Sequence, residues 1–231
     1  MMIRPLGQSG YLLESGQTRL LLDPYLSDAV ERIAGRPRLL PRPLEPAAVT
    51  ADAVICTHDH ADHLDSDAIR LMPRGLRFVS TPGGCDRLRA LGRTDFVALA
   101  TGDSLTIGDF ELTAAFARHT VETFGLIARA EGLTLYFSSD TLFDERLLEV
   151  AAYRPDAVFI CINGRLGNMN TEEALAVCKR LGAGINVPNH YDMFASNSAE
   201  PAKFSDRIAG GRTLEFNREY ILEAGGHLHE K

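Results

Sequence analysis

A short run of metal-ligand side chains constrains this chain more than any other feature. Residues 57–65 read THDHADHLD, which places three histidines and three aspartates within nine residues. The run follows AVIC at residues 53–56, an apolar stretch with the length and composition of a buried strand. A solvated acidic loop is the simpler alternative, but packing gives no reason for histidine and aspartate to alternate. We therefore interpret residues 57–65 as a metal-binding loop at the end of a strand.

The spacing within this loop predicts how it would use its ligands. His58, His60, Asp62 and His63 have the order H-x-H-x-D-H. In an extended loop, His58 and His60 can point to the same side and hold one cation. Asp62 and His63 lie beyond them and can face a second position. Neutral imidazole and carboxylate groups suit zinc, and they also suit manganese or iron.

Three more candidate ligands stand elsewhere in the chain. His119, Asp140 and His190 each follow an apolar segment with strand character, as His58 does. Sites in layered α/β folds open at the carboxyl ends of strands, so a shared position there favours one common site. Each residue also has a simpler explanation by itself: Asp140, for example, could be the N-cap of a helix that begins at Leu142.

The order of expected elements predicts a single α/β domain. Strand-like and helix-like segments alternate through both halves of the 231 residues, with no repeat or flexible linker between them. We expect one compact domain over residues 1–231, made of two similar αβ halves. The clearest hairpin turns at Glu131-Gly132, and Asn170 with Glu173 resembles the start of a capped helix. Near the end, a strand followed by a polar tail is expected, in which His227 and His229 would be mobile surface residues.

Composition and charge limit where the protein is expected to act and which partners it is expected to bind. The net charge of −7 disfavours non-specific binding to nucleic acid. No apolar run approaches the roughly 20 residues of a membrane span, and the N-terminal residues do not resemble a signal peptide. The four cysteines show no CxxC spacing and read as reduced structural thiols. We expect a cytoplasmic protein with a small-molecule substrate and no membrane or nucleic-acid partner.

The full set of candidate ligands resembles that of the metallo-β-lactamase-fold superfamily. The resemblance runs from the H-x-H-x-D-H motif through His119 and Asp140 to His190 and covers nearly the whole chain. The segments LGQSGYLLESGQTRLLLDPYLSD, YFSSDTLFD, NGRLGNMNTEEA and VPNHYDMF are similar to the branch that contains L-ascorbate-6-phosphate lactonase. The resemblance implies a four-layer αβ/βα sandwich with the site at one edge. Ser139 departs from it, because many relatives have glycine there, and this would change the space beside Asp140.

The resemblance also implies a dinuclear centre. Two divalent cations are expected, for which zinc fits best and manganese or iron would also fit. The superfamily pattern divides the ligands into a first set, a second set and one shared residue: His58, His60 and His119; Asp62, His63 and His190; and Asp140.

This centre predicts a hydrolase that acts on a small metabolite. A hydroxide shared by two cations would attack an electrophilic carbonyl or phosphorus, and Asp62 would relay a proton to the leaving group. An anionic ester, lactone or phosphate-bearing compound fits the similar branch. Arg165 could contact its anionic group, with Arg36 and Arg38 as weaker candidates. Polar side chains that could donate or accept further hydrogen bonds to it are Asn163, Asn168, Asn189 and Tyr191.

Other functions remain open from the sequence. A phosphodiesterase or nuclease of the tRNA-processing type would use the same ligands, but the acidic charge and the lack of a basic arm disfavour it. A thiolester hydrolase would need an appended helical region that this short chain lacks. A metal-binding scaffold without activity would not need a complete ligand set. Relatives often form oligomers, so a homo-oligomer is compatible with the sequence.

Overall fold

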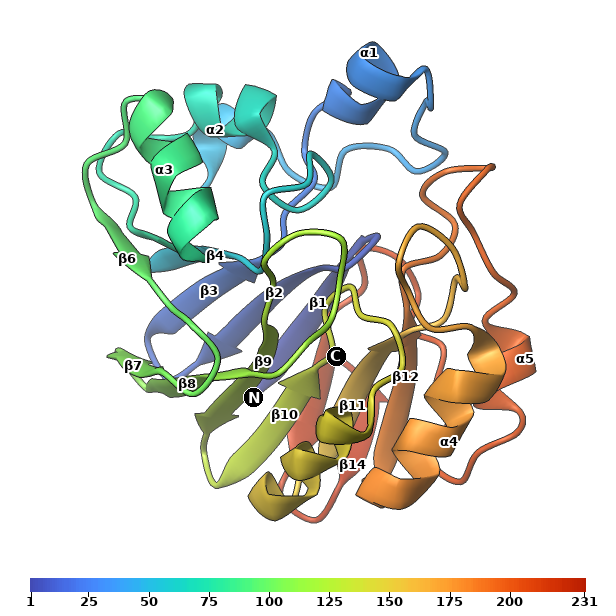
Figure 1. Ribbon diagram of the computed structural model, residues 1–231. Helices are drawn as coiled ribbons and strands as arrows, with labels where there is room; N and C mark the ends of the chain where they lie inside the picture. The colour runs from blue at the N-terminus through green and yellow to red at the C-terminus, as the bar shows by residue number, and fades with distance from the viewer.

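The computed structural model describes residues 1–231 as two β-sheets that pack face to face, with helices on their outer sides (Figure 1). The first sheet has eight strands in the order β14-β13-β1-β2-β3-β4-β5-β6. Its strands from β3 to β6 are parallel, and those from β14 to β3 are antiparallel. The bounds are β1 (Met2–Gly7), β2 (Gly10–Ser15), β3 (Thr18–Leu22), β4 (Ala53–Cys56), β5 (Phe78–Ser80), β6 (Phe96–Ala98), β13 (Tyr220–Glu223) and β14 (His227–Glu230).

The second sheet has six strands in the order β12-β11-β10-β9-β8-β7. Its parallel part is β10, β11 and β12. The expected hairpin joins β9 to β10, and Glu131 and Gly132 at its turn both have positive φ, as a type I′ turn requires. The bounds are β7 (Ser104–Ile107), β8 (Phe110–Ala115), β9 (Gly125–Ala130), β10 (Leu133–Phe137), β11 (Ala157–Cys161) and β12 (Ile185–Asn189).

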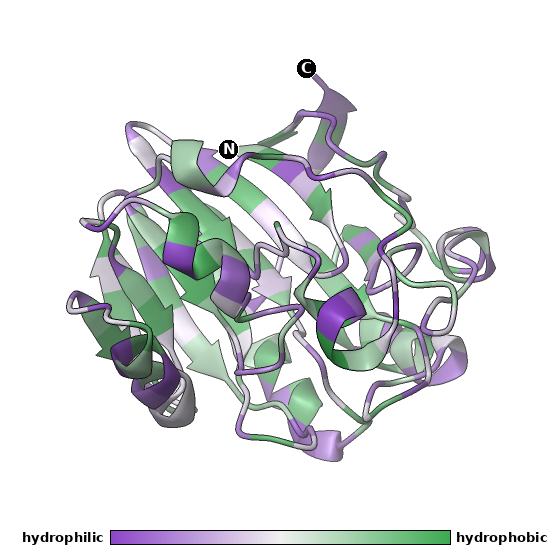
Figure 2. Cartoon of the chain, turned by 90° about the horizontal axis from the view of Figure 1, so that it is seen from above, coloured by the Kyte–Doolittle hydropathy of each residue, from purple (hydrophilic) through white to green (hydrophobic).

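Three apolar clusters hold four layers together, as expected. The largest, 27 buried residues, lies between the sheets. A second joins the first sheet to α2 (Ser66–Leu71) and α3 (Pro82–Ala90), and a third joins the second sheet to the 3₁₀ helix η2 (Glu145–Tyr153) and α4 (Thr171–Leu181). Figure 2 shows apolar strands in the interior beneath more polar helix surfaces. The remaining short helices are α1 (Ala29–Ala34), η1 (Pro46–Ala48) and α5 (Ala202–Ser205).

Strand β10 shows how the sequence produces this layering. Every residue of the strand is buried, so its two faces must both be covered. Leu135 and Phe137 join the cluster between the sheets, whereas Tyr136 between them joins the cluster under η2 and α4. Successive side chains point to opposite faces, so a continuous apolar strand packs on both sides.

The structure agrees with some of the expected local features and differs from others. Asn170 caps α4 in a full capping box with Glu173, and all four cysteines are buried and free. The expected polar tail was wrong: β14 pairs with β13, and the tail histidines lie on this exposed edge strand. Asp140 caps no helix, because η2 begins later and Asp144 is its N-cap. None of the helices has the length and apolar character needed to cross a membrane.

Candidate metal centre

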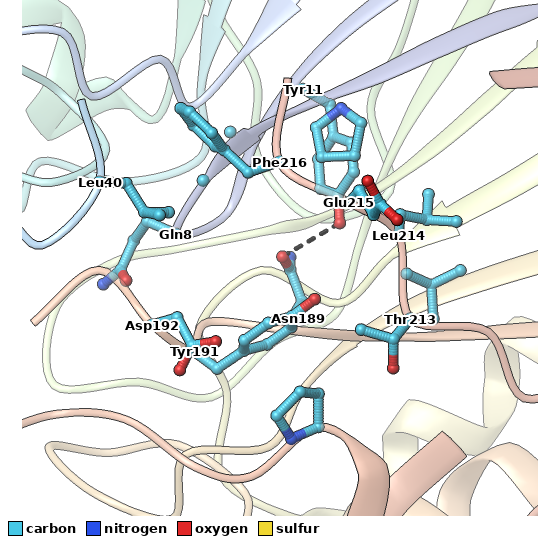
Figure 3. A pocket seen from close by; sticks show the side chains of 15 residues that line it. Gln8, Tyr11, Leu40, Asn189, Tyr191, Asp192, Thr213, Leu214, Glu215 and Phe216 are labelled. Atoms are coloured by element: carbon cyan, nitrogen blue, oxygen red, sulfur yellow. Dashed lines mark hydrogen bonds between the residues drawn. The ribbon is translucent and has the colours of Figure 1, made fainter. Parts of the chain in front are cut away.

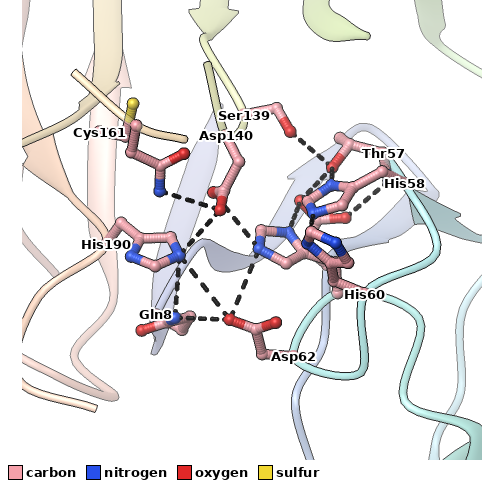
Figure 4. A network of polar contacts seen from close by, with 12 residues as sticks. Gln8, Thr57, His58, His60, Asp62, Ser139, Asp140, Cys161 and His190 are labelled. Atoms are coloured by element: carbon pink, nitrogen blue, oxygen red, sulfur yellow. Dashed lines mark hydrogen bonds and ion pairs between the residues drawn. The ribbon is translucent and has the colours of Figure 1, made fainter. Parts of the chain in front are cut away.

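All seven candidate ligands converge at one edge of the sandwich. The loop after β4 carries four of them, and the segments after β10 and β12 carry Asp140 and His190 (Figure 4). Parallel strands bring their carboxyl ends to the same side, which explains why these segments meet. His119 and Asp140 do not end their strands as expected: β8 ends at Ala115 and β10 at Phe137, so short connections carry both ligands to the centre.

The first ligand set brings three imidazole nitrogens face to face. His60 Nδ1 lies 3.1 Å from His58 Nε2 and 3.2 Å from His119 Nε2. A tetrahedral zinc ion with Zn–N distances of about 2.0–2.1 Å holds its ligand nitrogens about 3.3 Å apart. These three nitrogens therefore have the separation that a single cation requires.

The second ligand set mixes imidazole with carboxylate. Asp62 Oδ2 lies 3.7 Å from His190 Nε2 and 3.8 Å from His63 Nε2. His63 and His190 are fully buried, while the side chain of Asp62 is 17% exposed. The first set is buried to a similar degree, since the side chains of His58 and His119 are at most 1% exposed and His60 is half-buried.

Asp140 lies between the two sets. Its Oδ1 is 3.3 Å from His63 Nε2, and its Oδ2 is 3.1 Å from His190 Nε2 and 3.8 Å from His119 Nε2. One carboxylate thus approaches ligands of both sets, as expected for a bridging residue.

Unpaired buried atoms test whether a cation fits here. His63 Nε2 and Asp140 Oδ1 are both buried without a hydrogen-bond partner. An unsatisfied buried polar atom costs about 1–3 kcal/mol, so such atoms are rare in native proteins. A divalent cation would satisfy both atoms at once, and the residues present therefore fit a metal.

Charge and burial set the protonation of the ligands. Burial lowers the pKa of His58 and of His60, which favours the neutral imidazole that binds metals. Burial alone would raise the pKa of Asp140, but His190 and His63 outweigh it and hold that pKa well below its usual range. Burial opposes the charged form of His63, yet Asp140, Asp23 and Asp62 raise its pKa.

Behind the second set, Asp23 orients His63. Asp23 follows β3, the parallel neighbour of β4, and its Oδ2 lies 2.8 Å from His63 Nδ1. Its carboxylate also accepts hydrogen bonds from the backbone nitrogen and hydroxyl of Thr57, each at 2.7 Å. A carboxylate behind a ligating histidine fixes the tautomer and strengthens the ligand.

The last aspartate of the histidine-rich loop has a structural role. Asp65 caps α2 by accepting from the backbone nitrogen of Ala68, and it also accepts from the backbone nitrogens of Leu26 and Ser27. It therefore anchors the end of the loop to a neighbouring segment and does not belong to the ligand sets.

The loop at residues 163–168 supports ligands from the opposite side. The carbonyl of Gly167 lies 3.0 Å from His119 Nδ1, and Asn168 Nδ2 donates to Asp140 Oδ2 at 2.9 Å. Asn163 in turn accepts from Asn168 at 3.0 Å. One short loop thus holds a ligand of the first set and the shared carboxylate.

Gln8 was missed in the sequence. Its Nε2 donates to Asp62 Oδ2 at 2.7 Å and lies 2.9 Å from His190 Nε2 (Figure 4). The backbone carbonyl of Gln8 accepts from the backbone nitrogen of His190 at 3.0 Å. In the structure, Gln8 is buried in the turn between two strands and has a positive φ. A single glutamine in LGQSG looks like ordinary turn chemistry, so no motif reveals it.

A cavity of about 390 Å³ opens onto the ligands. Arg36 is the sole arginine or lysine among its lining residues. The mouth carries two exposed apolar side chains, Ile33 at 59% and Leu166 at 55%. The other apolar residues that line it are Val30, Ala34, Ala61 and Phe194.

The four predicted substrate contacts lie outside this cavity. Arg165 donates to the carbonyl of Ser196 and is exposed, and Asn163 is buried in the amide network described above. Asn189 and Tyr191 line a different cavity. Their role in substrate binding stays a prediction, and Arg36, a weaker candidate from the sequence, is the basic side chain that the structure places beside the ligands.

Similar proteins agree with this geometry. Residues 18–191 match the family model described as the beta-lactamase superfamily domain. The chain is 27% identical to a metal-dependent hydrolase from Methanosphaerula palustris, with 96% of each chain covered. It is 29% identical to a metal-dependent hydrolase from Pyrobaculum islandicum, with 99% of each chain covered.

Solved structures show the same fold. A metallo hydrolase from Ignicoccus hospitalis superposes with a TM-score of 0.77 at 21% identity, covering 94% of this chain and 96% of the other. An isothiocyanate hydrolase from Delia radicum gut bacteria gives a TM-score of 0.81 at 17% identity, covering 97% and 100%. The ligand geometry and the family match together establish that this chain belongs to the beta-lactamase superfamily and is a metal-dependent hydrolase with the metallo-β-lactamase fold.

Proposed function

We propose that the protein hydrolyses a small ester or lactone that carries one anionic group and an apolar part, at a centre of two divalent cations. The convergence of two ligand sets on the shared Asp140, at the floor of a cavity, carries this proposal. Zinc suits the all-imidazole first set best, and manganese or iron would also suit the mixed second set. Divalent cations in such a centre lower the pKa of water towards neutrality and polarise the scissile carbonyl.

Asp62 is the side chain placed to move a proton. It lines the cavity, and one of its oxygens is held by Gln8. A carboxylate fixed at the cavity floor can accept a proton from the attacking water and pass it to the leaving group. We therefore assign Asp62 as both a ligand and the proton relay.

The cavity walls support the substrate class. Arg36 offers a single positive charge, which suits one carboxylate or phosphate group. Ile33 and Leu166 at the mouth are too exposed to serve the core, so they would contact an apolar part of the substrate. Such an arrangement favours a small amphipathic anion over a polyanion such as nucleic acid.

A substrate screen tests the proposal. Metal content is measured by elemental analysis of protein purified without added metal, and the loaded enzyme is assayed on esters, lactones, a phosphodiester and an isothiocyanate. The proposal expects two cations per chain and the highest kcat/KM on an anionic ester or lactone. Preference for the phosphodiester would favour the nuclease-type alternative and overturn the assigned substrate class.

Two variants sharpen the assignment of roles. Arg36→Ala is expected to raise KM for the anionic substrate about tenfold and to leave an uncharged analogue unaffected. Arg32→Ala, an exposed arginine that pairs with Asp67 outside the cavity, is the matched control. Asp62→Asn is expected to lower kcat at least a hundredfold at saturating metal. Full activity in Asp62→Asn would exclude the relay.

A further inference from the structure

Gln8, which contacts the metal ligands, also lines a second cavity (Figure 3). Its volume is about 310 Å³, within the range of about 300–1,000 Å³ typical of small-molecule sites. It would hold a compound of roughly ten non-hydrogen atoms, given about 30 Å³ for each water-sized group. Nothing in the metal-dependent hydrolysis uses this space.

The end of β12 separates the two cavities. His190 lines the metal cavity, whereas its neighbours Asn189, Tyr191 and Asp192 line the second one. Gln8 lines the second cavity too, while its Nε2 contacts Asp62 and His190. The two cavities are therefore separate, and Gln8 and the end of β12 form the wall between them.

The lining of the second cavity has a definite chemical character. Three aromatic rings, those of Tyr11, Tyr191 and Phe216, contribute to it, and no lysine, arginine or histidine does. Its charged side chains are the carboxylates of Asp192 and Glu215. This lining disfavours an anion and suits a positive charge, because carboxylates and ring faces both attract cations.

Three side chains that line this cavity are relevant to the binding of a cation. Glu215 lies 3.7 Å from Arg218, which offsets part of its charge. The carboxylate of Asp192 accepts one hydrogen bond, from the hydroxyl of Ser198, and has no cationic partner. Gln8 is 4% exposed, and its Oε1 is a buried acceptor without a donor. An ammonium group in the cavity supplies the positive charge that Asp192 lacks.

We propose that this second cavity is a binding site for a small organic cation, an amine with an apolar or aromatic body. The ammonium group binds beside Asp192, and the apolar body packs among Tyr11, Tyr191 and Phe216. The site is separate from the metal cavity, whose basic residue is Arg36, so the two cavities select ligands of opposite charge. This assignment does not depend on the substrate proposed for the metal centre.

A set of three probes of similar size tests the assignment. 2-Phenylethylammonium, 2-phenylethanol and phenylacetate carry positive, zero and negative charge on nearly the same body. Their binding to the full chain is measured by calorimetry at neutral pH, with and without zinc. We expect saturable binding of 2-phenylethylammonium with a millimolar to micromolar Kd, at least tenfold weaker binding of 2-phenylethanol, and no displacement of the amine by phenylacetate, whose carboxylate suits the metal cavity instead.

Two variants locate the binding. Asp192→Asn keeps a residue that tolerates the positive φ of this position and is expected to weaken 2-phenylethylammonium binding at least threefold. Asp206→Asn removes an equally exposed carboxylate outside the cavity and should leave the Kd unchanged. Displacement of the amine by phenylacetate, no saturable binding of the amine, or an unchanged Kd in Asp192→Asn would each overturn the assignment. These outcomes are independent of turnover, so they are distinguishable from failure of the proposed hydrolysis.

Discussion

The two ligand sets differ in chemistry and in their supporting contacts. The first consists of three histidines, of which His60 and His119 line the cavity. The second contains Asp62, with Asp23 behind His63 and Gln8 against His190. Both sets reach the cavity, but the first has imidazole ligands alone, whereas the second includes a carboxylate and has more supporting side chains.

The difference predicts that the two positions of the proposed dinuclear centre bind their cations with different strength. A cation held by carboxylate and by well-oriented buried histidine exchanges more slowly than one held by imidazoles at a cavity. The second position would then hold its cation more tightly than the first. Substitutions that affect one set, both sets or their supports can break this comparison or sharpen it.

The largest effect is expected from Asp140→Asn, because this carboxylate approaches both sets. Loss of its charge should remove at least one cation, weaken the other and lower kcat/KM by about a thousandfold or more. Elemental analysis and a steady-state assay measure the two effects. Retention of both cations with near-normal activity would contradict a shared role, and circular dichroism controls for folding.

A matched pair of ligand substitutions is expected to come next. His119→Ala should empty the first position and His190→Ala the second, each lowering the metal content from two to one and activity by at least a hundredfold. Because Asp23 and Gln8 support only the second set, the cation that remains in His119→Ala should resist a chelator longer than the one in His190→Ala. Equal chelation rates would show that the supports do not distinguish the positions.

Asp23→Asn tests the support behind His63 without removing a ligand. The amide oxygen can still accept from the Thr57 backbone nitrogen, but the NH2 group then faces His63 Nδ1 and cannot accept from it, so cation affinity at the second position should fall about 10- to 100-fold. Affinity at the first position should stay within twofold, as titration with competing chelators can show. Asp52→Asn, the same substitution at the other end of β4, is the control.

Gln8→Ala should have the smallest effect of the series. It removes one hydrogen bond to the charged Asp62 and the contact with His190, so affinity for the second cation should fall about tenfold. Gln17→Ala, an exposed glutamine in the next turn, should change nothing. If Gln8→Ala altered only the first position, the assignment of Gln8 to the second set would be wrong.

The convergence of the candidate ligands could be predicted from the sequence, since their signal is local. Four ligands stand in one loop, and Asp140 and His190 follow apolar strands, so strand ends in an α/β fold bring them together. The four layers follow from the resemblance to the superfamily, and the apolar clusters of the structure agree with them.

The supports were not predictable, because they depend on which segments meet in space. Asp23 precedes a proline at the end of a strand and looks like a turn residue, and Gln8 lies in a glycine-rich turn. The sequence named Arg36 but ranked it below Arg165, since both lie in irregular loops and only the path of the chain brings Arg36 to the cavity.

The loop at residues 163–168 has a consequence for how specificity can change. Its Gly167 carbonyl and Asn168 amide are committed to the metal ligands, while Leu166 at its tip projects to the cavity mouth in a left-handed conformation that leucine rarely adopts. The tip can therefore be exchanged without disturbing the anchors beside it. Substitutions at residue 166 alone should change which compounds enter the cavity without moving the metal ligands. Asparagine or glycine at this position should also lower the backbone strain, because both tolerate positive φ.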